Sequence, residues 1–190
     1  MALPDIEVNR YDSPGQRTLR QERANAPAYW LIDIVWYILV DGEDSGGSFS
    51  LIEQYMREGS GPIPHVHAFI DEWFYVLEGK IDFTVGDDRF TAGPGDSLWI
   101  PRNTVHVFTS MTDCHVLNAY TPAGFEQVVK GSGTPAAARE LPPKDFPPPS
   151  EDVFRLFYNN YWCAQADKSW SQPKAGVGPG DRVLDGSGRQ

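Results

Sequence analysis

Three histidines and a glutamate occur in the sequence at a spacing that suits a metal ion. His65 and His67 are two residues apart, so on an extended strand both imidazoles project from the same face. Glu72 lies five residues beyond His67, an odd separation that requires the chain to turn between positions 68 and 71. His106 is delivered by a further strand, after Pro101 and a short bend. Imidazole nitrogen and carboxylate oxygen predict one divalent transition-metal ion: Fe, Ni, Mn, Co or Zn.

Four protein ligands leave two positions of an octahedral shell open, which predicts binding or reaction at the metal. A structural zinc site is normally closed and rich in cysteine, and neither Cys114 nor Cys163 is near these ligands. Two cysteines also give no sign of a disulfide framework. His115 stands outside the pattern and is interpreted as structural. Asp71 competes for the carboxylate role, and the spacing favours Glu72.

The candidate ligands lie in a region of short strands and turns. From residue 29 to about 120, strands of four to ten residues are separated by turn signals at 41–47, 59–62, 86–88 and 92–96. The 18 glycines and 16 prolines favour the same interpretation. The sequence therefore predicts an all-β fold, a sandwich or barrel, in which several strands converge on one point.

A single domain accounts for the 190 residues, because one hydrophobic core of this size already buries most of what it can. The longest apolar stretch, Tyr29 to Val40, is shorter than the roughly 20 residues of a membrane helix and is interpreted as a buried strand. Helices are predicted at 123–131 and from Ser150 onward. The predicted parts are an arm at 1–28, the barrel at about 29–122, a helical extension at about 123–165 and a flexible tail at about 166–190.

The net charge and the first residues of the chain indicate which partners and which cellular location to expect. The formal charge of -10 repels phosphate backbones, so nucleic acid is not an expected partner. No apolar stretch is long enough to cross a membrane, so a membrane is not an expected partner either. The first residues show no basic start followed by an apolar run, which predicts a cytoplasmic protein.

On these residues the chain resembles the cupins. The first cupin motif, G-x5-HxH-x4-E-x6-G, is matched by Gly59, His65, His67, Glu72 and Gly79. The second, G-x5-P-x-G-x2-H-x3-N, is matched by Gly95, Pro101 and His106, with Asn103 in place of its glycine and Ser110 in place of its asparagine. The resemblance implies a single cupin (jelly-roll) β-barrel with short C-terminal helices. It also implies a homodimer that pairs through an exposed strand edge, for which the strand-like segment 29–40 is the candidate.

Within the cupins, residues 29 to 138 are most similar to small single-domain bacterial quercetin 2,3-dioxygenases. This similarity implies a metal-dependent dioxygenase that adds O2 to a flavonol-like or other enolisable or phenolic substrate, with the metal-bound Glu72 as base. Two alternatives stay open: a cupin isomerase, lyase or cyclase that uses the same metal without O2, and a non-catalytic ligand-binding cupin.

Apolar side chains near the ligands are candidates for contact with an aromatic substrate. Phe74 and Val76 share strand parity with the glutamate, and Phe108 shares it with the third histidine, so all three are expected to face the same cavity. Tyr55 and Met56 on the preceding strand are further candidates, and only one of these two neighbours can face inward.

Overall fold

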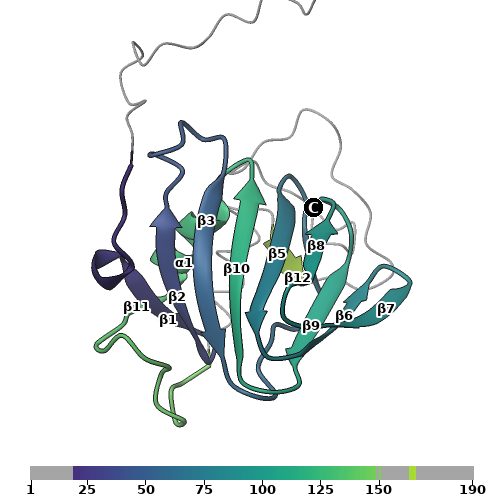
Figure 1. Cartoon of the computed structure of the whole chain (residues 1–190). Helices are drawn as coiled ribbons and strands as arrows, with labels where there is room; N and C mark the ends of the chain where they lie inside the picture. The colour runs from purple at the N-terminus through teal and green to yellow at the C-terminus, as the bar shows by residue number, and fades with distance from the viewer. Residues whose placement is uncertain (1–18, 149, 151–162, 166–190) are drawn as a thin grey trace, which may run out of the picture.

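The computed structural model describes residues 19–148, 150 and 163–165 of the 190. In this part of the chain the protein is all-β, with antiparallel strands in two sheets, one α-helix and one short 3-10 helix (Figure 1). Among these residues no helix is both long enough and apolar enough to cross a membrane.

The first sheet has seven strands in the order β11-β1-β2-β3-β10-β5-β8. Their bounds are β1 Ala28–Leu31, β2 Ile34–Val40, β3 Ser50–Met56, β5 Asp71–Glu78, β8 Ser97–Ile100, β10 Cys114–Thr121 and β11 Thr134–Pro135. The long neighbours β3, β10 and β5 form its centre.

The second sheet has five strands in the order β12-β4-β9-β6-β7. Their bounds are β4 His65–His67, β6 Ile81–Val85, β7 Asp88–Ala92, β9 His106–Ser110 and β12 Cys163–Gln165. The 3-10 helix η1 spans Arg23–Asn25, and the α-helix α1 spans Phe125–Ser132.

The two sheets face each other across one hydrophobic core. Along β10 buried and half-buried residues alternate strictly, because successive side chains of a strand point to opposite faces. Aromatic rings join the sheets: Phe74 of the first sheet lies 5.3 Å from Phe83 and 5.2 Å from Phe108 of the second, between ring centroids. Side chains of both sheets that point inward therefore share one interior, into which a site can be built.

The segment predicted as one buried strand is instead a hairpin. β1 and β2 pair with each other, and a turn at Ile32 and Asp33 joins them. The polar Asp33 breaks the apolar run, and its carboxylate accepts a hydrogen bond of 2.6 Å from the Ser60 hydroxyl. Because β1 also pairs with β11 and β2 with β3, the open edge that was predicted for this segment is absent, and the homodimer itself stays a prediction.

Beyond the barrel, the helix predicted at 123–131 is confirmed as α1. The last residues of the predicted helical extension form β12, a strand that pairs with β4. The helix predicted from Ser150 onward, most of the predicted arm and the predicted tail lie outside the described residues.

Candidate metal centre

Three strands deliver the four candidate ligands. β4 begins with His65 and ends with His67, β9 begins with His106, and Glu72 is the second residue of β5. His65 pairs directly with His106 across β4 and β9. Between β4 and β5 the chain crosses from the second sheet to the first, which is the turn that the odd spacing predicted. The carboxylate therefore faces the imidazoles across the interior.

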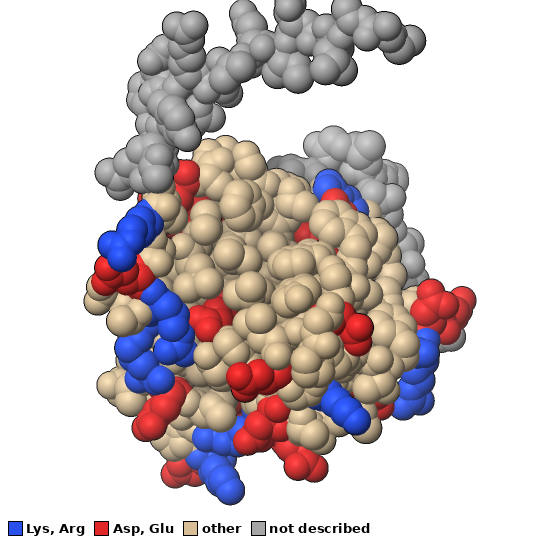
Figure 2. All heavy atoms as spheres, in the orientation of Figure 1, with Lys and Arg blue, Asp and Glu red and all other residues tan. Residues whose placement is uncertain are grey.

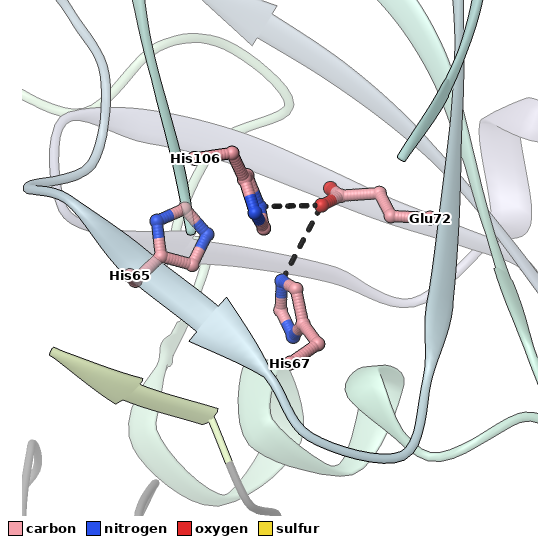
Figure 3. Close-up of side chains that lie close together, drawn as sticks. All are labelled: His65, His67, Glu72 and His106. Atoms are coloured by element: carbon pink, nitrogen blue, oxygen red, sulfur yellow. Dashed lines mark ion pairs between the residues drawn. The ribbon is translucent and has the colours of Figure 1, made fainter. Parts of the chain in front are cut away.

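The four side chains point toward one another (Figure 3). One ligand atom from each residue lies within 4.8 Å of the ligand atoms of the others. The Glu72 Oε2 atom is 3.0 Å from His106 Nε2 and 3.3 Å from His67 Nε2. Ligands on opposite sides of an ion are about 4.2 Å apart, because each bond is about 2.1 Å long. The cluster is therefore close to the size of one coordination sphere and is able to bind a metal.

Hydrogen bonding leaves the facing atoms available for a cation. The Nδ1 atoms of His65 and His106 each lie 2.9 Å from a backbone carbonyl oxygen, that of Ile63 and that of Thr104 respectively. A proton on Nδ1 donates to such a carbonyl and leaves a lone pair on Nε2. His106 Nε2, His67 Nε2 and Glu72 Oε2 are buried and have no hydrogen-bond partner among the described residues. Buried acceptors that converge without donors fit a bound cation.

Ionisation in the cluster also suits a metal. Burial, followed by the nearby imidazoles of His106 and His67, holds the pKa of His65 well below its usual value, and burial likewise lowers the pKa of His67. Burial by itself would raise the pKa of Glu72, but a proton that His106 or His67 directs at its carboxylate outweighs burial and keeps that pKa well below the usual value, and a cation in the same place acts in the same direction. Neutral imidazoles and an ionised carboxylate are the forms that bind metal.

Asp71, the competing carboxylate, points to the opposite face of β5. Its two oxygens accept hydrogen bonds from the Arg102 side chain, the shorter one 2.6 Å long, and one of them also accepts the Arg102 backbone N–H. The Arg102 side chain, opposed by partial burial, lowers the pKa of Asp71. The structure thus brings Glu72 into the cluster and places Asp71 in an ion pair outside it.

The turn that carries Arg102 also fixes the neighbouring strand. Asn103, which occupies the place of the glycine in the second cupin motif, has φ of 64°, a left-handed conformation that asparagine tolerates better than most residues. Its backbone N–H donates a 2.8 Å hydrogen bond to the carbonyl oxygen of His67. The departure from the motif therefore preserves the backbone that it requires.

The residues proposed to contact substrate fall into two groups. Phe74, Val76, Phe108 and Met56 are buried in the main core and contribute to the interior shared by the two sheets. Tyr55 lies on the outer face of β3, where its ring stacks on His115 with a centroid distance of 4.0 Å. Of the two neighbours on β3, Met56 is therefore the one that faces inward.

Two residues beside the cluster were not predicted from the sequence. The ring of Tyr120 lies 5.9 Å from that of His67, and the ring of Phe125, the first residue of α1, lies 5.2 Å from it. Tyr120 on β10 pairs in register with Glu72 on β5, so the two side chains point to the same face of the sheet. This could be inferred only once the pairing of the two strands was known. Phe125 reaches the site from a helix, to which strand parity does not apply.

A family model described as a cupin domain matches residues 52–120 and so contains all four candidate ligands. Both motifs, the two-sheet barrel and the converging histidines agree with that match. Residues 52–120 are a cupin domain. The match runs from β3 to β10, the strands that build the cupin interior around the ligands.

Two curated proteins and two solved structures are similar to this cupin. Quercetin 2,3-dioxygenase of Bacillus subtilis is 27% identical over 108 residues, which cover 55% of this chain and 32% of that protein. An uncharacterized protein of Methanocaldococcus jannaschii is 35% identical over 57 residues, or 30% of this chain and 46% of that protein. The chain therefore matches less than half of the length of each of these relatives.

The solved structures support the fold. An RmlC-like cupin from Shewanella frigidimarina has a TM-score of 0.52 at 16% identity and covers 60% of this chain and 99% of that one. A protein from Thermotoga maritima described as a predicted oxalate decarboxylase has a TM-score of 0.51 at 15% identity and covers 55% and 99%. At such identities the likeness concerns the barrel and not the reaction.

Proposed function

We propose that this cupin is a metal-dependent dioxygenase that adds O2 to a flavonol-like or other enolisable or phenolic substrate. The observation that carries the proposal is the convergence of three imidazoles and one carboxylate, with unpaired acceptor atoms, in an apolar interior. The similarity to quercetin 2,3-dioxygenase of Bacillus subtilis supports this reaction class.

The four clustered residues have separate tasks in this proposal. His65, His67, His106 and Glu72 would hold the divalent metal, which supplies Lewis acidity and a template for two reactants. The ionised Glu72 carboxylate accepts the proton of the acidic substrate hydroxyl when that oxygen comes within hydrogen-bond reach. The backbone carbonyls of Ile63 and Thr104 orient the imidazoles of His65 and His106.

The surroundings of the cluster suit a flat apolar substrate. Phe125 and Tyr120 pack against His67, and Phe74 and Phe108 belong to the core that continues into the barrel. Among the described residues, His65 is less buried than its three partners in the cluster. Apolar walls exclude water from the reacting groups and strengthen the electrostatic interactions between them.

An oxygen-uptake assay tests this function. Purified protein is reconstituted in parallel with Fe, Mn, Co, Ni and Zn, and flavonols, beginning with quercetin, and related enols are screened with an oxygen electrode. We expect one or more metals to support uptake of one O2 per substrate consumed, and chelation to abolish it. Equal turnover in strictly anaerobic buffer would refute the dioxygenase and point to a cupin isomerase, lyase or cyclase that uses the same centre.

We also propose that two copies of the chain pair through the outer face of the seven-stranded sheet. Figure 2 shows that the face over β10, β5 and β8 is mostly uncharged, with most charges around its margin. Its outward side chains include Leu117, Tyr75, Trp73 and Trp99, and the last is 51% exposed. Aromatic residues are enriched in interface cores, and a mostly uncharged face limits the number of carboxylates that two chains of charge -10 bring opposite one another.

Trp99→Glu is expected to convert the dimer to a monomer, because a charge would then be buried without a partner. The mass in solution is measured by light scattering during gel filtration. Met111→Glu is the matched control, since Met111 is also exposed, at 47%, but lies on the turn between β9 and β10. A monomeric wild-type chain at 100 µM, or a Trp99→Glu variant that remains dimeric, contradicts the proposal.

A further inference from the structure

The three histidines of the metal centre are oriented in different ways. His65 and His106 are each oriented by a hydrogen bond from Nδ1 to a backbone carbonyl. The ring of His67 is equally deep, with the residue 2% exposed, but neither of its nitrogens has a hydrogen-bond partner among the described residues. A ring without such a bond must be oriented by the groups packed around it.

Two aromatic rings supply that packing. Phe125 contacts the His67 ring edge to face, at 5.2 Å and an interplanar angle of 79°, and Tyr120 does so at 5.9 Å and 65°. Tyr120 and Phe125 are themselves stacked, at 4.3 Å and 17°. Rotation of either ring would change the space available to the imidazole, because interiors are closely packed. The orientation of His67 therefore depends on what fixes this aromatic pair.

A chain of buried hydrogen bonds fixes Tyr120. Its hydroxyl donates to Asn118 Oδ1, and Gln54 Nε2 donates to the same oxygen over 2.7 Å. Asn118 Nδ2 in turn donates a 2.9 Å bond to the carbonyl oxygen of Trp73. Because that carbonyl only accepts, it determines which end of the Asn118 amide is the nitrogen, and the amide oxygen must then face the tyrosine and the glutamine.

The network is not explained by stability alone. Gln54 and Asn118 are fully buried and Tyr120 is 1% exposed, in a core that is otherwise largely apolar. Gln54 Oε1 has no hydrogen-bond partner in the described part of the chain, so desolvation of that oxygen is uncompensated there. Apolar side chains of similar shape would fill the space at no such cost. What the network provides is one defined position for the Tyr120 ring, which lies opposite Glu72 in the strand register.

We propose that Tyr120 and Asn118 are positioning residues of the metal centre. Asn118 holds the Tyr120 hydroxyl, and the Tyr120 ring, with Phe125, keeps the His67 imidazole turned so that Nε2 faces Glu72. The inference rests on the metal-binding part of the proposed function, and it does not depend on whether O2 is consumed.

Tyr120→Phe tests the inference because it keeps the ring and removes only the anchoring hydroxyl. Titration of the metal-depleted full chain with Co2+, in competition with a chelating dye, gives the affinity, and the visible absorption of bound Co2+ reports the geometry of its ligands. We expect affinity to fall by about 10- to 100-fold, the usual effect of losing an outer-shell partner, together with a changed spectrum. Tyr37→Phe is the control, since Tyr37 is also 1% exposed but packs in the second cluster, with Val35 and Ala26.

Asn118→Leu provides a second measurement. It removes the oxygen that anchors Tyr120, so its effect on Co2+ affinity should match that of Tyr120→Phe, and the double variant should be no worse than either single one. Should Asn118→Leu fail to fold, Tyr120→Phe decides alone. Wild-type affinity and spectrum in Tyr120→Phe, an equal loss in Tyr37→Phe, or a wild-type chain that binds no Co2+ overturns the inference. If the wild-type chain binds Co2+ but no metal supports oxygen uptake, the proposed dioxygenase activity is contradicted and the inference about Tyr120 and Asn118 is not.

Discussion

Replacing His106 by alanine is expected to abolish stoichiometric metal binding. The Nε2 atom of His106 lies 3.0 Å from Glu72 Oε2 and is buried without a hydrogen-bond donor among the described residues. Loss of an outer-shell partner costs up to about 100-fold in affinity, and loss of a ligand should cost more. A metal at 100 times its dissociation constant stabilises the folded state by about 2.7 kcal/mol. The variant should therefore also lose the rise in thermal midpoint that metal gives the wild type.

Metal content by mass spectrometry and thermal midpoints with and without chelator measure both effects. His115→Ala is the matched control, because the remaining histidine of the four lies on the outer face, where its Nε2 is 2.7 Å from Glu53 Oε1. The His115→Ala variant should be somewhat less stable than the wild type and should keep its metal. One equivalent of metal in His106→Ala, or an equal loss in His115→Ala, would mean that the ion binds elsewhere.

The ligands were predictable because their geometry follows from local rules. Strand parity puts His65 and His67 on one face, and the odd step to Glu72 requires a turn, which the structure provides where the chain changes sheets. The choice between Asp71 and Glu72 rested on spacing alone. Asp71 lies outside the cluster because it pairs with Arg102, 31 residues further along the chain. No local sequence pattern encodes that contact.

The hairpin at β1 and β2 was missed for a different reason. Residues on both sides of the turn are apolar, so hydrophobicity does not mark it. Ile32 has φ of 61°, a conformation that is rare for a β-branched residue, and isoleucine is not a turn signal. A sequence that reads as one continuous strand therefore folds back on itself at a single strained residue.

Two further features, β12 and the packing of Phe125 against His67, were not predicted because they depend on contacts between distant segments. β12 comprises only three residues and pairs with the strand that carries His65 and His67, although Cys163 and His67 are far apart in the sequence. A strand this short has no periodic pattern from which to predict it. The packing of Phe125 against His67 is of the same kind, because it depends on where helix α1 lies over the barrel.

Glu72→Gln is expected to lower the kcat of oxygen-dependent turnover by about 10²- to 10⁴-fold, the usual contribution of a general base. Glutamine has nearly the same shape, and its amide oxygen still coordinates a cation, but the amide cannot accept a proton. The pKa of Glu72 lies well below its usual value, because contacts with His106 and His67 outweigh the effect of burial. The carboxylate is therefore ionised at neutral pH, which is the form that can accept a proton.

Metal content and turnover must be measured on the same preparation, because Glu72 is proposed both to bind the metal and to accept a proton. Asp71→Asn is the matched control, since it changes a neighbouring carboxylate that is bonded to Arg102 outside the cluster. If Glu72→Gln keeps its metal but loses turnover, Glu72 acts as the base. If the variant loses both its metal and its turnover, the result supports Glu72 as a metal ligand only. Turnover that survives in Glu72→Gln, or falls equally in Asp71→Asn, contradicts the role of Glu72. The chemistry of the centre would then rest on the three imidazoles.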